Sequence, residues 1–145
     1  MVQISVCPQL QPHGELIAGL QRARFVQGDQ ARPLKPGDKI TVRLELRTDR
    51  YLDHVHLKDL RAAGLEPVQA ISGYEWKGGL GYYRSIRDAA MHFFFDRIAP
   101  GTYVFEYDLK VTHAGTFSNG ITSVQCMYAP EFSSHSEGLV ITVGE

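Results

Sequence analysis

The sequence predicts an all-β fold, an antiparallel β-sandwich of about seven strands. Segments 40–47 and 103–112 alternate between apolar and polar residues with the period of two that marks a half-buried strand. Turn-forming residues recur at intervals of roughly 8 to 12 residues, a spacing typical of sandwiches. No stretch of useful length shows a helical period, and the 14 Gly and 7 Pro favour short strands joined by turns.

At the N-terminal end, residues 1–21 carry no sustained period and contain chain breakers between Cys7 and Gly14. We expect an inbound linker, the end of a preceding domain or an edge strand here, and one β-sandwich domain over 22–145. Adjacent Pro36 and Gly37 predict a tight turn. A strand should follow, with four apolar residues facing inward: Ile40, Val42, Leu44 and Leu46.

The middle of the chain predicts two strands separated by a long loop. Segment 53–59 alternates, with Val55 and Leu57 facing inward and His54, His56 and Lys58 outward. Segment 72–83 is dense in Gly and aromatic residues and predicts a long surface loop, with a new strand starting in segment 82–85. The short aromatic run 91–96 predicts a strand buried on both faces.

The C-terminal third opens with the longest alternation of the chain. In segment 103–112 the inward set is Tyr103, Phe105, Tyr107, Leu109 and Val111. A further strand should carry Val124, Cys126 and Tyr128 on one face, and Ala129-Pro130 should end its pairing. The last strand should hold Leu139, Ile141 and Val143.

Length, charge and cysteine content narrow the possible functions. With 145 residues and a formal net charge of −1, the chain fits one domain and lacks the basic surplus of a nucleic-acid-binding protein. No apolar run approaches the roughly 20 residues that span a bilayer, so we expect no membrane insertion of this chain. Cys7 and Cys126 show no CxxC spacing and could form one disulfide or none.

Seven ordered segments between about Arg22 and Val143 carry a family resemblance. They are LKPGDK (34–39), VHLKD (55–59) with AGLEP (63–67), GLGYY (79–83) with RD (87–88), FFD (94–96), GTYVFEY (101–107), HAG (113–115) and MYAPEF (127–132). Together they resemble the C-terminal macroglobulin-like domain of bacterial alpha-2-macroglobulin family proteins, of the Bacteroidetes type.

The resemblance implies a β-sandwich that follows the thioester domain of a longer, protease-trapping parent, itself periplasmic or associated with the cell envelope. It implies no enzymatic activity for this chain, with neighbouring domains of the parent as direct partners and proteases as indirect ones. The family's thioester lies in a Cys-x-Glu-Gln arrangement, which neither Cys7 nor Cys126 matches. Where many relatives carry adjacent prolines and a Glu, segment 118–120 and Gln125 stand here instead, a departure that fits the Bacteroidetes forms.

Several residue groups could carry other chemistry, and each has a simpler explanation. His54 and His56 could begin a metal site on one strand face, but a site needs a third ligand, and the sequence does not show whether His92, His113 or His135 approaches them. Segment 133–136 contains Ser and His without a nucleophile motif, and Gly78-Gly79-Leu80-Gly81 lacks the following helix that a phosphate loop needs. Four aspartates that could suggest calcium are also typical of turns and strand ends: Asp49, Asp53, Asp59 and Asp88. We therefore expect no catalytic residue, no cofactor and no metal.

The predicted working surface lies on the Gly- and aromatic-rich segment. A loop with several glycines is costly to order, and its apolar side chains leave water only against a partner or against the domain itself. Trp and Tyr are also typical interface anchors. The hypothesis is a partner interface formed by Tyr74, Trp76, Leu80, Tyr82 and Tyr83. The alternative is a carbohydrate-binding module that stacks sugar rings on the aromatic members of this set.

Overall fold

The computed structural model describes residues 18–26, 34–136 and 138–145, and these residues form twelve strands in three sheets. The four-stranded sheet has the order β1-β2-β8-β4, the six-stranded sheet β11-β10-β3-β7-β6-β5, and β9 and β12 pair with each other. The bounds are β1 Ala18–Val26, β2 Lys39–Thr48, β3 Leu52–Leu60, β4 Leu65–Pro67, β5 Gly73–Lys77, β6 Leu80–Ile86, β7 Ala90–Ile98, β8 Gly101–Val111, β9 Gly115–Asn119, β10 Thr122–Cys126, β11 Ala129–His135 and β12 Leu139–Val143.

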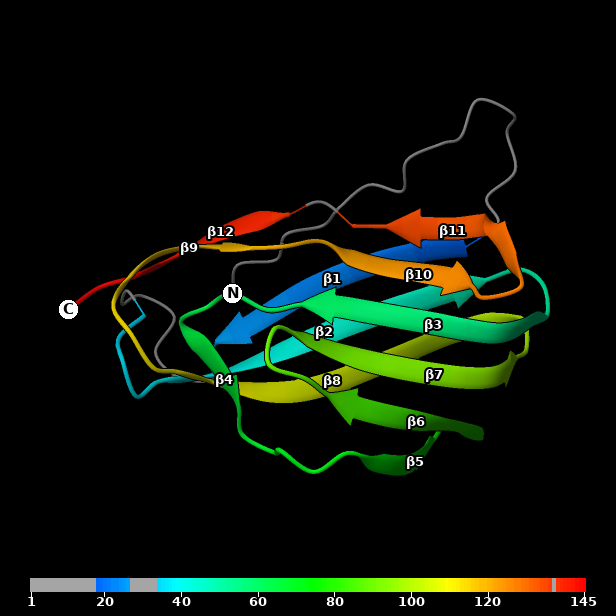
Figure 1. Cartoon of the computed structure of the whole chain (residues 1–145), viewed down its shortest axis with the longest axis horizontal. Coiled ribbons are helices and arrows are strands. Elements are labelled where there is room, and N and C mark those ends of the chain that lie inside the picture. The colour runs from blue at the N-terminus through cyan, green and yellow to red at the C-terminus, as the bar shows by residue number, and fades with distance from the viewer. Residues whose placement is uncertain (1–17, 27–33, 137) are drawn as a thin grey trace.

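The two larger sheets form the layers of a sandwich, as Figure 1 shows, with β3, β7 and β6 in front of β2 and β8. All strand pairs within the three sheets are antiparallel. Because successive side chains of a strand point to opposite faces, they alternate between the core and the outer surface. The core is a single apolar cluster that includes Leu44 of β2, Phe93 and Phe95 of β7, and Phe105 of β8.

The all-β, antiparallel sandwich predicted from the sequence is confirmed, but the described part of the chain contains twelve strands rather than about seven. Two inward-facing sets are confirmed in full, since every predicted apolar residue of β2 is buried and those of β8 are buried from Phe105 to Val111, with Tyr103 half-buried against the core. The extra strands are mostly short ones, such as β4 and β5, in segments where Gly and Pro hide any alternation.

Four local predictions are wrong. Segment 72–83 is not a loop, because β5 and β6 pair as a hairpin around Gly78 and Gly79, both of which have positive φ. Strand β7 is buried on one face only, since His92 and Phe94 are half-buried on the other. Tyr128 is 80% exposed because it lies in the turn after β10, and Ala129-Pro130 begins β11 instead of ending the pairing.

The proposed division of the chain at residue 21/22 falls inside a strand. Strand β1 begins at Ala18 and pairs with β2 along its whole length at the edge of the four-stranded sheet. Residues 1–17, and Cys7 with them, lie outside the described residues, so the linker assignment stays a prediction. Cys126 is buried in the core.

A buried polar cluster ties the two layers together. Asp59 of β3 is fully buried and accepts hydrogen bonds from the hydroxyl of Tyr107 on β8 and, at 2.6 Å, from that of Thr122 on β10. Nearby, the backbone N–H of Thr122 donates to Ser136 Oγ at 3.1 Å. Buried polar groups are costly unless they are paired, so this cluster fixes the register of three strands.

Candidate functional site

The outer face of the six-stranded sheet carries a row of aromatic side chains that the core does not use. The strand register places Tyr74 of β5 beside Tyr83 of β6, Tyr83 beside Phe94 of β7, and Phe94 beside His56 of β3. Two further rings flank the row, Trp76 and His92. We call these six residues the aromatic face: His56, Tyr74, Trp76, Tyr83, His92 and Phe94. It crosses four adjacent strands, β5, β6, β7 and β3.

The most exposed part of the aromatic face is the β5–β6 hairpin. Tyr74 and Trp76 are 82% and 81% exposed, although β5 lies at the edge of the sheet. Tyr74 contacts Tyr83 edge-on, with ring centroids 5.0 Å apart. The Trp76 indole lies across Gly81, where an added Cβ would meet its ring atoms at 3.1 Å. Because Gly81 has no side chain, the Trp76 indole packs directly against the strand and still remains exposed to solvent.

The predicted interface set divides between the two faces of this hairpin. Leu80 and Tyr82 are 7% and 5% exposed and belong to the core, so neither can contact a partner directly. Tyr74 and Trp76 are exposed and Tyr83 is half-buried on the outer face. The hypothesis of an aromatic interface is thus narrowed to these three residues, and it stays a prediction.

The inner side of the hairpin is held by a polar network. Glu75 accepts a hydrogen bond from the Tyr82 hydroxyl at 2.9 Å and forms an ion pair with Arg84 at 2.6 Å. Burial, followed by the neighbouring Glu75 carboxylate, raises the pKa of Tyr82 to about 12, so the phenol stays protonated and remains a donor. Arg84 also donates to Gln69 at 3.2 Å. These contacts fix the position of the hairpin, and with it the positions of the aromatic rings on its other side.

In the centre of the sheet the aromatic face contains two hydrogen-bonded histidines, which we call the imidazole pair. His56 Nε2 and His92 Nδ1 are 2.8 Å apart, and the ring planes are within 4° of parallel with centroids 5.1 Å apart. In each ring the nitrogen lies little more than one ångström from the ring centroid. The centroid distance therefore equals the N···N distance plus the two nitrogen-to-centroid distances, which is possible only when all four points lie on one line. The two rings therefore meet edge to edge in one plane, joined by a linear N–H···N bond. Phe94 lies parallel to His56, with centroids 4.7 Å apart.

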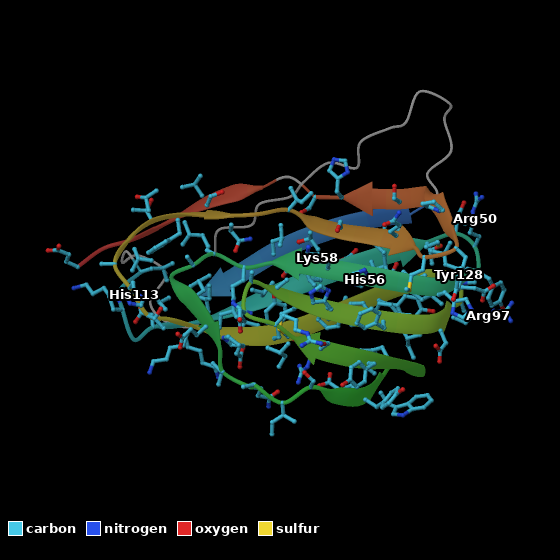
Figure 2. The ribbon with its side chains drawn as sticks, viewed as in Figure 1. Arg50, His56, Lys58, Arg97, His113 and Tyr128 are labelled. Atoms are coloured by element: carbon cyan, nitrogen blue, oxygen red, sulfur yellow. The ribbon has the colours of Figure 1, made fainter. Side chains whose placement is uncertain are left out.

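The pKa values of both histidines are lowered. For His56 the causes are burial, then His92 and Lys58; for His92 they are burial, then Lys58 and Arg87. Lys58 is the direct cross-strand neighbour of His92, and Figure 2 shows it beside His56 on the sheet. Sequence reasoning placed His56 outward and named His92 as one of three histidines that could approach it, but could not choose among them, because cross-strand register cannot be read from one sequence.

His54 does not join this pair. It has a positive φ of 51°, and its ring contacts Tyr128 edge-on with centroids 4.9 Å apart. Tyr128 lies with Arg50 and Arg97 at one end of the sandwich (Figure 2), where the Arg97 guanidinium stands 4.7 Å above the Tyr51 ring. His54 and His56 therefore face different neighbours and do not share a site.

The described residues contain no group of three or more His, Cys, Asp or Glu side chains that could hold a metal ion. Three of the four aspartates considered for calcium are engaged separately. Asp49 pairs with Arg50 at 3.0 Å, Asp53 with Arg97 at 3.4 Å, and Asp59 belongs to the buried polar cluster. No helix in the described part of the chain is long and apolar enough to cross a membrane.

The family model of the bacterial alpha-2-macroglobulin MG10 domain matches residues 18–131. The chain belongs to this family. A curated alpha-2-macroglobulin homolog from Nostoc is 30% identical over 127 residues, which are 81% of this chain and 6% of that protein. The MG10 domain thus spans a small part of the length of the curated relative it matches.

Solved structures of bacterial alpha-2-macroglobulins share the fold. Escherichia coli alpha-2-macroglobulin activated by porcine elastase matches with a TM-score of 0.73 and 15% identity, over 95% of this chain and 14% of that one. Native E. coli alpha-2-macroglobulin, in a structure spanning domain MG7 to the C-terminus, matches with a TM-score of 0.69 and 15% identity, over 89% of this chain and 24% of that one. At these identities the likeness shows the fold alone.

Proposed function

We propose that this MG10 domain is a non-catalytic part of a larger protease-trapping protein of the alpha-2-macroglobulin family and docks against a neighbouring domain of that parent through the aromatic face. The observation that carries the proposal is the exposure of Tyr74 and Trp76 on an ordered hairpin. The backbone holds two large rings in water, and covering them with a partner removes apolar surface from water, which lowers the free energy of association. The Nostoc relative is far longer than this chain, which supports a parent protein with neighbouring domains as the partner.

The wider context of the proposal follows the family. The parent acts outside the cytoplasm, in the periplasm or at the cell envelope, and this domain lies in its C-terminal region, after the thioester domain. That placement follows the family resemblance of the seven segments between Arg22 and Val143. Because neither cysteine of this chain lies in a Cys-x-Glu-Gln motif, the 145-residue chain alone should leave the activity of a protease on a protein substrate unchanged at any dose.

Hydrogen–deuterium exchange of the 145-residue chain and of the intact parent tests the docking. Peptides covering β5 and β6 should exchange more slowly in the parent than in the isolated chain, and Trp76→Ala should remove most of that protection. Val140→Ala is the matched control, because Val140 is also an exposed apolar side chain but lies on β12. This variant should leave the protection of β5 and β6 unchanged. Equal exchange of the hairpin in the parent and in the isolated chain would refute docking through this face.

A second measurement separates docking from a core role for the indole. Trp76 is the single tryptophan of the chain, so its fluorescence reports this site alone. The isolated chain should emit as a water-exposed indole, and Trp76→Ala should change its unfolding free energy by no more than about 0.5 kcal/mol. A blue-shifted emission together with a large loss of stability would show that the ring belongs to the core.

Carbohydrate binding is the second candidate, favoured by the exposure of Tyr74 and Trp76 on one side of a hairpin. Such rings can stack on the apolar face of a sugar. Quenching or a blue shift of Trp76 fluorescence by an oligosaccharide at millimolar concentration, lost in Tyr74→Ala, would favour this function over docking.

A further inference from the structure

The imidazole pair has a proton arrangement that limits what it can present to a partner. In the neutral pair one N–H lies in the N–H···N bond, so one of the two outer nitrogens, His56 Nδ1 and His92 Nε2, carries hydrogen and the other is an acceptor. After uptake of a single proton the N–H···N bond remains and both outer nitrogens become N–H donors. A second proton would break the bond, because no acceptor would remain between the rings.

No described residue hydrogen-bonds to either outer nitrogen. The pair's own bond also excludes a shared metal ion, since the lone pair that would bind it points at the neighbouring ring's nitrogen across only 2.8 Å. What the pair offers outward is therefore hydrogen bonding and, after protonation, one positive charge.

The groups around the pair are positive or neutral on nearly every side. Lys58 on β3 and Arg87 in the turn before β7 are the cations that lower the pKa of His92. On β6, Ser85 lies opposite His92 and Tyr83 opposite Phe94, and on β10, Ser123 lies opposite Lys58 and Gln125 opposite His56. Along β7 the face also carries Asp96, beyond Phe94, and along β3 it carries His54; neither contributes to the pKa shift of the pair.

We propose that the imidazole pair receives an Asp or Glu carboxylate of the docked partner, with Lys58 as the second positive group and Phe94 and Tyr83 as the apolar surround. This deepens the docking function proposed above and rests on it. The two outer nitrogens lie at opposite ends of the linear pair, so one carboxylate accepts a hydrogen bond from only one of them. Protonation of the pair ensures that this nitrogen carries hydrogen and adds a positive charge, and such charge-assisted bonds are the strong ones. The apolar rings beside the pair exclude water once a partner covers them, which strengthens the same bonds.

The pair also gives the docking face its selectivity. A partner that placed an apolar group over the outer nitrogen that faces it would leave that nitrogen unpaired, and a partner Lys there would add a third positive charge beside Lys58. Both arrangements are unfavourable. Because the carboxylate binds the singly protonated pair, binding is coupled to proton uptake. Affinity should rise as pH falls, by up to about tenfold per pH unit above the pair's own titration range, and level off below that range.

The test uses the 145-residue chain with benzoate as probe, which joins a carboxylate to an apolar ring. In NMR spectra of the histidine rings, benzoate should shift the His56 and His92 signals, raise the midpoint of their titration, and bind more tightly at pH 5.5 than at pH 7.5. Benzamide, which has the same shape without the charge, should do neither. His92→Gln should abolish the response, whereas His113→Gln is the control, since His113 is exposed at the opposite end of the sandwich from Arg97 (Figure 2).

The outcomes separate this inference from the docking proposal. Equal shifts with benzoate and benzamide, or no response of the two rings at tens of millimolar benzoate, would overturn the carboxylate site even where the hairpin is protected in the parent. In the parent, His92→Gln should weaken protection of the face at pH 5.5 more than at pH 7.5. A pH-independent effect of His92→Gln would also count against the carboxylate, while leaving the role of Trp76 standing.

Discussion

Replacing Phe105 by alanine should remove a large part of the stability of this domain. Phe105 is 2% exposed, and its ring packs against Tyr82, Phe95 and Phe93 at centroid distances of 5.2, 5.4 and 5.7 Å. The substitution deletes one ring from the centre of a four-ring cluster contributed by both layers. Large-to-small changes of this kind cost about 3–5 kcal/mol, and the loss of three ring contacts favours the upper half of that range.

Urea denaturation followed by far-UV circular dichroism measures this loss, since Trp76 is too exposed to report on the core. The free energy of unfolding of a domain is typically about 5–15 kcal/mol, so Phe105→Ala should lower the urea midpoint strongly and reduce the melting temperature by about 10–20 °C. Glu106→Ala is the matched control on the next residue, because Glu106 points outward and its ion pair with Arg43 is long, at 3.9 Å, and exposed. The two variants unfolding at the same urea concentration would refute the inward assignment of β8.

Three further predictions concern the buried polar cluster, a close backbone approach and the imidazole pair. Asp59→Asn removes the charge that accepts two buried hydroxyl hydrogen bonds and should cost about 1.5–3 kcal/mol in urea unfolding; a change below 0.5 kcal/mol would contradict this. Gly64→Ala should cost about 1–3 kcal/mol, because the new Cβ would lie 2.5 Å from the Phe117 ring, whereas Gly73→Ala has open space and should be nearly neutral; similar melting temperatures for the two would argue against the close approach. Both pKa values of the pair are lowered from 6.5, so the free energy of unfolding should fall as pH drops below about 6.5, and His92→Gln should flatten that dependence; parallel pH profiles would show that other groups control it.

The sequence was informative where one period governs a whole strand. In β2 and β8, apolar residues stand at every second position over eight or more residues, and burial follows that alternation. The β5–β6 hairpin obeys the same period, but Gly73 and Gly81 occupy strand positions where a side chain would have revealed it. The two-residue Gly78-Gly79 connection is a recognised hairpin signal, and weighing it would have predicted that Tyr74 and Trp76 face away from Leu80 and Tyr82.

Strand periodicity and hairpin signals could not have predicted the imidazole pair. His56 and His92 lie 36 residues apart, and they meet because β3 and β7 pair in one register out of several that the sequence allows. A slip by one residue would send one ring into the core and the other outward. The buried side chains opposite them, such as Val55 paired with Phe95 and Leu57 paired with Phe93, select the register. The core thus determines which residues meet on the outer face.

The core does not explain why the outward-facing residue 94 is a phenylalanine. In the run Phe93-Phe94-Phe95 the strand period sends the first and third rings into the core, and both are 2% exposed. The middle ring faces outward, where a Thr or Lys would serve the strand equally well. Instead Phe94 lies parallel to His56, inside a row that continues through Tyr83 to Tyr74. Folding accounts for the two inner rings, and the apolar Phe94 ring beside a hydrogen-bonded imidazole pair agrees with the proposal that a partner covers this surface in the parent protein.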